Sequence, residues 1–198
     1  MNLFKIFIAA LLIDNVVLMR FLALCPFIGM STDEDKSIGM GLAVTFVTVL
    51  ATAVTWPIFR FILEPLGLMF LQTLVFILVI ASLVQLVEFF LKKSVKSLYE
   101  SMGIYLALIT TNCGILAVTL DVINNNCVFT EKPYTFLEAI VYAIGVAMGF
   151  LLSMLLLAGI RRRLRTSPIP AFLNGTPVLF AATALLSIAF MGFKGLVK

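Results

Sequence analysis

Six long apolar runs, separated by short gaps, limit most strongly what this chain can fold into. Each run approaches or exceeds the ~20 residues that a helix needs to cross about 30 Å of hydrocarbon. An open sheet cannot satisfy its backbone hydrogen bonds in lipid, so all six runs are predicted to be helices. The predicted spans are Leu3–Leu24, Ile38–Leu63, Leu68–Leu91, Leu98–Val122, Tyr134–Ile160 and Thr176–Phe193.

The composition indicates a polytopic membrane protein and excludes a soluble domain. Of the 198 residues, 62% are hydrophobic and 12% are charged, and the mean hydropathy is +1.16. No gap is long enough to fold separately, so one membrane domain over residues 1–198 is predicted. The first run lacks a small-x-small cleavage site, so it is expected to remain as a span. Histidine, the commonest metal ligand and proton shuttle, is absent.

Basic residues are distributed unequally between the two sides of the membrane. Six spans place both termini on one side, which carries five basic residues, whereas the other side carries nine. Because basic residues favour the cytoplasmic side, the termini are predicted to lie outside. The run Arg161–Arg165 contributes most of the excess of basic residues on the side predicted to be cytoplasmic. We interpret it as an orientation anchor that contacts anionic lipid. The net charge of +4 is therefore assigned to membrane contact and not to nucleic acid.

Two cysteines lie in or at the end of apolar runs, and each precedes a residue that disturbs a helix. Cys25 is followed by Pro26, which stops or kinks a helix, and Cys113 by Gly114, which permits close approach to the backbone. Thiolates are soft ligands that suit iron–sulfur clusters, zinc or Cu(I). A [2Fe–2S] cluster usually takes four cysteines, so another protein chain would have to supply two. The alternative, in which each thiol is a buried small hydrophobe, stays open.

The chain divides into two halves of three spans, roughly residues 1–92 and 98–198, and each half has a cysteine in its first span. Three spans per half give the halves opposite orientations, as in the inverted repeats of many membrane proteins. At 1.5 Å per residue, straight helices would place Cys25 and Cys113 at depths about 10 Å apart. We therefore predict an all-α integral membrane protein with six transmembrane helices in two inverted three-helix repeats, helices one and four being broken. Cys127, in an Asn-rich external loop, is expected not to be a ligand.

Several polar residues lie within the predicted spans and are candidates for an ion path. Asp14 and Asn15 interrupt the first span, while Thr110 and Asn112 precede the second thiol. Ionisable groups at membrane depth are costly and usually functional. A buried ion pair, or a hydrogen bond between helices, is an equally open interpretation of Asp14.

Two further motifs have mainly structural interpretations. Gly145 and Gly149 form a GxxxG pattern, which permits another helix to approach closely, although the pattern is common by chance. Trp56 and Pro57, near the end of the second span, fit an interfacial aromatic residue beside a kink.

The motifs around these residues resemble the A-subunit family of the Rnf complex, the ion-translocating ferredoxin:NAD oxidoreductase. The resemblance rests on Phe21-Leu-Ala-Leu-Cys25-Pro-Phe-Ile-Gly29, Leu108-Ile-Thr-Thr-Asn112-Cys113, Ala158-Gly-Ile-Arg161 and Ala189-Phe-Met-Gly-Phe193. It extends over essentially the whole chain. The paralogous D and E subunits of the Na⁺-translocating NADH:quinone reductase are also similar, and the Cys-Pro-Phe and Phe-Met-Gly-Phe segments favour the A subunit.

The resemblance implies a subunit of a redox-driven ion pump that is not catalytic alone. Its partner would be a homologous E subunit of inverted topology, and each of the two would contribute two cysteines to one [2Fe–2S] cluster. By match of motif, the ligands in this chain would be Cys25 and Cys113. The complex would also contain flavin-bearing subunits D and G and iron–sulfur subunits B and C, in a bacterial or archaeal cytoplasmic membrane. Electron flow would drive Na⁺ or H⁺ across the membrane.

One hypothesis for coupling is that negative charge gained at mid-membrane attracts a cation past Asp14, Asn15, Thr110 and Asn112. Two other classes of function remain open. A small secondary transporter also uses inverted repeats and broken helices, and it would contain no iron. A cofactor-free scaffold subunit would tolerate serine at both cysteines.

Overall fold

The computed structural model describes residues 2–31, 34–67, 69–94, 108–109, 111–124, 134–166 and 175–192. Within these ranges all regular secondary structure is helical, and no strand occurs. This agrees with the predicted all-α membrane class. Residues 95–107 and 125–133, which include part of the predicted fourth span and Cys127, lie outside the described residues, as does Thr110.

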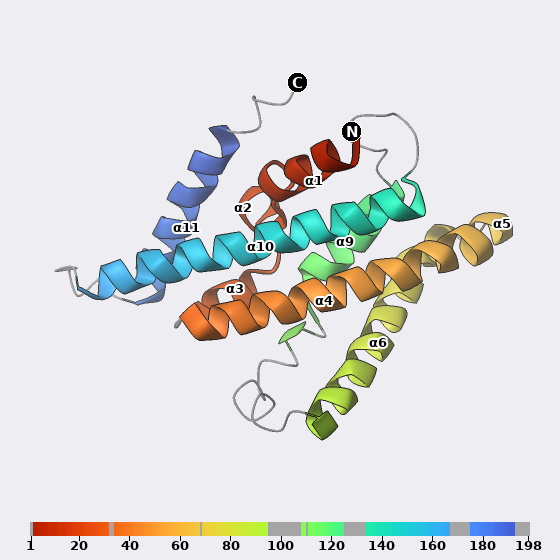
Figure 1. Cartoon of the computed structure of the whole chain (residues 1–198), viewed down its shortest axis with the longest axis horizontal. Coiled ribbons are helices and arrows are strands. Elements are labelled where there is room, and N and C mark those ends of the chain that lie inside the picture. The colour runs from red at the N-terminus through yellow and green to blue at the C-terminus, as the bar shows by residue number, and fades with distance from the viewer. Residues whose placement is uncertain are drawn as a thin grey trace.

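Two long helices form the axis of the molecule (Figure 1). They are α4 (Glu34–Ile58) and α10 (Phe136–Arg165), which lie side by side and run in opposite directions. The hydrophobic core surrounds them, and Phe27, Met40 and Met154 are fully buried there. Because both helices are apolar on several faces, one face packs in the core while the others are free to contact lipid.

The first apolar run is broken into three short helices, as predicted. They are α1 (Asn2–Leu12), α2 (Val16–Arg20) and α3 (Leu24–Met30). The second break contains two non-glycine residues in the left-handed region, Phe21 at φ 55° and Ala23 at φ 60°. Such irregular backbone is tolerated at membrane depth only where protein surrounds it.

Asn15 holds the first break in place. Its Oδ1 accepts from the backbone N–H groups of Val17 and Leu18 at 3.2 and 3.3 Å, which caps the start of α2. Its Nδ2 donates to the carbonyl of Gly149 at 2.9 Å and to Ser153 Oγ at 2.7 Å, both on α10. The side chain is fully buried, so these four hydrogen bonds account for its polar atoms.

The GxxxG pattern is the place where α1 packs against α10. A Cβ atom at Gly145 would lie 2.7 Å from Ala10 Cβ, and one at Gly149 would lie 2.7 Å from the carbonyl oxygen of Leu11. Only glycine leaves room for this approach of the two backbones. The interpretation of the pattern as a helix contact is confirmed.

The second span ends in a backbone irregularity at the expected position. Pro57 lies near the end of α4, and a π-helical turn, η1 (Phe59–Leu63), follows it. Proline removes a backbone donor, and a π-turn is one way to absorb the loss. Trp56 Nε1 donates to the carbonyl of Tyr134 at 3.2 Å, which ties this end of α4 to the start of α10.

Beyond this turn the chain continues through α5 (Glu64–Leu66) and η2 (Met69–Leu71) into α6 (Gln72–Ser94). Helix α6 leaves the axis of the molecule at an angle (Figure 1). Its apolar side chains, including Leu74, Leu78 and Leu86, are largely exposed. In a membrane this surface would face lipid or another protein chain.

Three helices are long and apolar enough to cross a membrane, at Ser37–Leu63, Gln72–Phe89 and Phe136–Leu164. These match the second, third and fifth predicted spans. The remaining apolar helices among the described residues are shorter, namely α1, α9 (Cys113–Asn124) and α11 (Thr176–Met191). The count of six spans and the inverted repeat therefore stay predictions.

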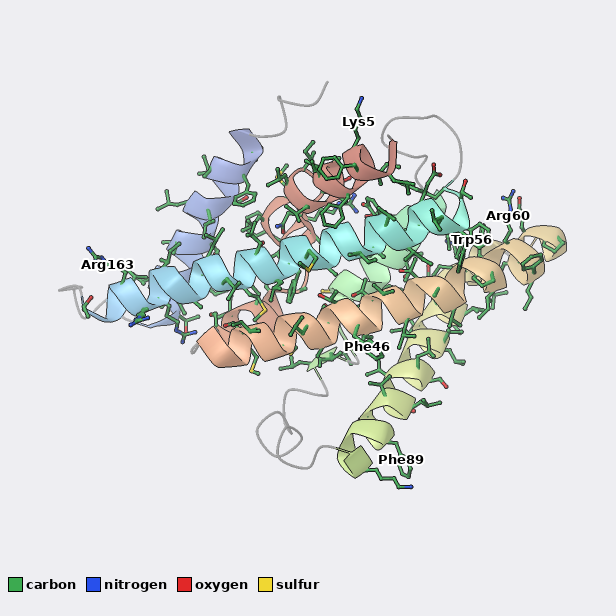
Figure 2. The ribbon with its side chains drawn as sticks, viewed as in Figure 1. Lys5, Phe46, Trp56, Arg60, Phe89 and Arg163 are labelled. Atoms are coloured by element: carbon green, nitrogen blue, oxygen red, sulfur yellow. The ribbon has the colours of Figure 1, made fainter. Side chains whose placement is uncertain are left out.

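Charged residues mark the two ends of the long axis. Figure 2 shows Arg60 near Trp56 at one end and Arg163 at the other. This is the separation expected for residues on opposite sides of a membrane. Which side is cytoplasmic rests on the charge asymmetry of the sequence.

Substitution of Gly149 by alanine is expected to destabilise the fold. The new Cβ would lie 2.7 Å from the carbonyl oxygen of Leu11, so α1 or α10 must shift. Overpacking of this kind costs about 1–3 kcal/mol. Thermal unfolding of the detergent-purified protein measures it as a lower Tm. Gly159→Ala on the same helix is the matched control, because no described residue has an atom within 4 Å of its Cβ position. Equal Tm values for the two variants would contradict the packing described here.

Candidate metal centre

Cys113 is the first residue of α9, directly after an interruption of the helical backbone. Leu108 and Ile109 are helical, whereas Thr111 and Asn112 are not. Asn112 caps the helix, since its Oδ1 accepts from the N–H of Gly114 at 2.9 Å. Asparagine is among the preferred residues at this position. Helix four is predicted to be broken, and within the described residues an interruption lies directly before the second thiol.

Cys25 is the second residue of α3, so it also follows an interruption. The expectation that Pro26 stops or kinks a helix after the thiol is wrong. Pro26 lies in the first turn of α3, where its missing N–H has no intrahelical partner to lose. The break lies before Cys25, at Phe21–Ala23, and proline helps to begin the next helix.

The break brings the two cysteine segments into contact. The backbone N–H of Ala23 donates to Cys113 Sγ at 3.0 Å. Cys25 is only two residues further along the chain, and two residues span at most about 7 Å. The segment before Cys25 thus meets the start of α9, a contact that straight helices would not bring about. Both thiols are free and exposed.

Gly114 makes this contact possible. A Cβ atom at Gly114 would lie 3.0 Å from Ala23 Cβ and 3.2 Å from Asn112 Oδ1, closer than most real Cβ contacts. The helix breaker after the second thiol thus acts as predicted, by allowing another segment to approach the backbone.

Arg161 holds the far end of α3. Its Nη1 donates to the carbonyl of Ile28 at 3.1 Å and to Ser31 Oγ at 3.2 Å. Ser37 Oγ donates to the carbonyl of Met30 at 3.2 Å. A cation is favourable at the carbonyl end of a helix. Arg161 thus stabilises α3, the helix that contains Cys25, in addition to any role in orienting the chain. The sequence did not predict this contact, because it joins residues far apart in the chain.

An ion pair lies between the broken run and α9. Arg20 Nη1 contacts Asp121 Oδ2 at 2.5 Å, and the two side chains are 39% and 12% exposed. Asp14 and Tyr142 lie within electrostatic range of the same guanidinium. Sequence reasoning did not single out Asp121, although an acidic residue inside an apolar run was a usable signal.

The candidate ion-path residues fall into different environments. Asn15 is committed to the four hydrogen bonds described above. Asp14 is partly buried at the break between α1 and α2. Asn112 lies beside Cys113, and its buried Nδ2 has no hydrogen-bond partner among the residues that the structure describes. Their part in ion transport stays a prediction.

A cavity of about 310 Å³ opens beside Cys113. Thr111, Asn112 and Cys113 contribute one wall, and apolar residues of α6 and α9 form the rest: Ile77, Ile80, Ala81 and Leu116. A thiolate there would lie in largely apolar surroundings, where electrostatic interactions are stronger than in water.

The donor set fits half of a metal–sulfur site. Two soft sulfur ligands are exposed on chain segments that contact one another, and one of them already accepts a backbone hydrogen bond. Among the residues that the structure describes, no group of three or more His, Cys, Asp or Glu side chains is arranged to hold a metal ion. Completion of a four-thiolate site would therefore require ligands from elsewhere.

Comparisons with known proteins find a matching family model and relatives that align along nearly the whole chain. The model of the Rnf-Nqr family, described as "Rnf-Nqr subunit, membrane protein", matches residues 3–197. A relative from Acetobacterium woodii is 49% identical over 196 residues, covering 99% of this chain and 98% of the relative, and is named as the A subunit of a Na⁺-translocating ferredoxin:NAD⁺ oxidoreductase complex. Two further relatives are named as the A subunit of an ion-translocating oxidoreductase complex. The one from Syntrophotalea carbinolica is 50% identical, and the alignment covers 99% of this chain and 98% of the relative. The one from Yersinia enterocolitica is 46% identical, and the alignment covers 98% of this chain and 96% of the relative.

Proposed function

Because this chain belongs to the Rnf-Nqr family of membrane subunits, we propose that it carries electrons within the membrane as the A subunit of a ferredoxin:NAD oxidoreductase that translocates ions. The full-length similarity to relatives with the A designation supports this assignment. The observation that carries the redox part is the hydrogen bond from Ala23 N–H to Cys113 Sγ, because it joins two cysteine segments that are distant in sequence.

Cys25 and Cys113 are the residues that would hold the metal group, as two thiolates. A [2Fe–2S] cluster, when bound, supplies a one-electron carrier inside the membrane. The homologous E subunit of inverted topology would provide two further cysteines. The exposure of both thiols supports this arrangement, since a ligand to a shared group must lie at a surface.

The other parts of the chain fix these ligands. Asn112 and Gly114 set the start of α9, while Arg161 holds the end of α3. Apolar residues of α6 and α9 line most of the cavity beside Cys113. A group held in this way has little freedom to reorganise when an electron arrives.

Ion transport is the second part of the proposal, and Asp14 is its main candidate in this chain. The relative from Acetobacterium woodii is named as Na⁺-translocating. Asp14 lies at a helix break, within electrostatic range of Arg20. A carboxylate at irregular backbone in a membrane suits a site that takes up Na⁺ or H⁺.

The complex that this assignment implies contains several partners in a bacterial or archaeal cytoplasmic membrane. They are the E subunit, the flavin-bearing D and G subunits and the iron–sulfur B and C subunits. The termini would lie on the outer side, in keeping with the nine basic residues on the opposite side.

Substitution of either ligand by serine is expected to abolish the cluster, because a hydroxyl replaces a thiolate poorly. Cys25→Ser and Cys113→Ser should each remove a [2Fe–2S] signal from low-temperature EPR spectra of the dithionite-reduced complex. Cys127→Ser is the matched control and should retain it. A complex that lacks iron and acid-labile sulfide at this site would contradict the redox assignment and favour a secondary transporter. Retention of electron transfer in both serine variants would favour a scaffold.

Removal of the charge of Asp14 is expected to reduce the number of ions moved per electron, because the path loses a carboxylate. Asp14→Asn should lower Na⁺ or H⁺ uptake into proteoliposomes several-fold at an unchanged rate of ferredoxin oxidation. Glu64→Gln serves as the control, since that side chain is exposed and pairs with Arg60. An unaltered ratio of ions to electrons in Asp14→Asn would exclude Asp14 from the path.

A further inference from the structure

The backbone N–H of Ala23 has an unusual environment. It donates to Cys113 Sγ at 3.0 Å, and the residue is 2% exposed. Its φ of 60° lies in the left-handed region, which is unfavourable for an L-residue that has a Cβ atom. Backbone strain of this kind persists only where the surrounding structure fixes it.

Three sets of contacts fix the segment. The N–H groups of Phe21 and Leu22 bond to the carbonyls of Val17 and Val16 at 3.0 and 3.2 Å, a Schellman-type end for α2. The ion pair between Arg20 and Asp121 joins the end of α2, directly before this segment, to α9.

The third contact is with α9 itself. Ala23 packs against the bare backbone of Gly114, one residue after the thiol. Its own carbonyl accepts from Phe27 N–H at 3.3 Å, which begins the hydrogen bonding of α3. The Ala23 peptide is therefore held from α2, α3 and α9 together.

We infer that the Ala23 peptide N–H donates a fixed hydrogen bond to a ligand sulfur, and that this bond raises the reduction potential of the metal group. Gly114 is the positioning residue for the donor. This inference rests on the proposed function. A hydrogen bond to sulfur offsets negative charge, so it favours the state that has gained one electron. Hydrogen bonds to the sulfurs are among the determinants of iron–sulfur potentials.

Gly114→Ala tests the inference by pushing the donor away. The new methyl group would lie 3.0 Å from Ala23 Cβ, so the Ala23 segment has to move relative to α9. At a fixed ambient potential, the ratio of reduced to oxidised cluster should fall about tenfold, which corresponds to about 59 mV for a one-electron couple. Potentiometric EPR titration of the purified complex measures this ratio. The signal to follow is the component that is missing from Cys113→Ser.

The double variant Ala23→Gly/Gly114→Ala provides the rescue. It removes the methyl group that the new one would meet, and glycine adopts positive φ without strain. The potential should return toward the wild-type value. Ala23→Gly alone keeps the N–H and should leave the potential unchanged. An unchanged potential in Gly114→Ala, or no recovery in the double variant, would overturn the inference.

A second measurement remains decisive if Gly114→Ala fails to assemble. Complex labelled with ¹⁵N-alanine in an alanine-auxotrophic host should show a ¹⁵N hyperfine coupling to the reduced cluster in pulsed EPR. Ala23→Gly, labelled in the same way, should lose that coupling while it keeps the wild-type potential. Absence of the coupling in the wild type, or its persistence in Ala23→Gly, would overturn the inference while leaving the cluster assignment intact. Absence of any Cys113-dependent signal in the wild type would overturn both.

Discussion

The buried side-chain amide of Asn15 is the interaction on which the rest of the structure depends. A helix broken within a membrane exposes backbone N–H and C=O groups that lipid cannot satisfy. Asn15 caps the helix that starts after the first break and, at the same time, donates to the carbonyl of Gly149 and to Ser153 on α10. One residue thus satisfies donors at the start of α2 and fixes the break against α10. The close approach at Gly145 and Gly149 brings α1 near enough for this to happen.

Side chains of other helices also satisfy the ends of α2 and α3. Ser187 of α11 donates to the carbonyl of Leu18 at 2.5 Å, at the end of α2. Arg161 of α10 donates to the carbonyl of Ile28, at the end of α3. Distant helices thus supply donors to carbonyls that a continuous helix would have satisfied internally. The segment between α2 and α3 is therefore well fixed, and there the peptide N–H of Ala23 donates to Cys113 Sγ. A site for a redox group needs this kind of fixed geometry.

Much of this arrangement is predictable from the sequence, and the exceptions have a common cause. The apolar runs locate α4, α6 and α10, because length and hydropathy suffice for a membrane helix. The requirement that Cys25 and Cys113 share a depth predicts the break in the first run. The first break lies at Asp14 and Asn15, the residues that interrupt the predicted span. The break expected at Pro26 lies before Cys25 instead, because proline resembles an end signal when it occupies a first turn. The partners of Arg161 and Arg20 escape prediction, since their contacts join residues far apart in sequence and no local pattern encodes them.

Cross-linking of the two thiols tests most directly whether the broken helix brings them together. The complex would carry Cys127→Ala and be freed of iron by chelation, then treated with dibromobimane, which fluoresces strongly once both of its arms have reacted. Peptide mapping should find the peptides of Cys25 and Cys113 joined by one bimane, with little modification of either thiol alone. Recovery of the two peptides separately modified, with no joined product, would contradict the fold on which the redox site rests.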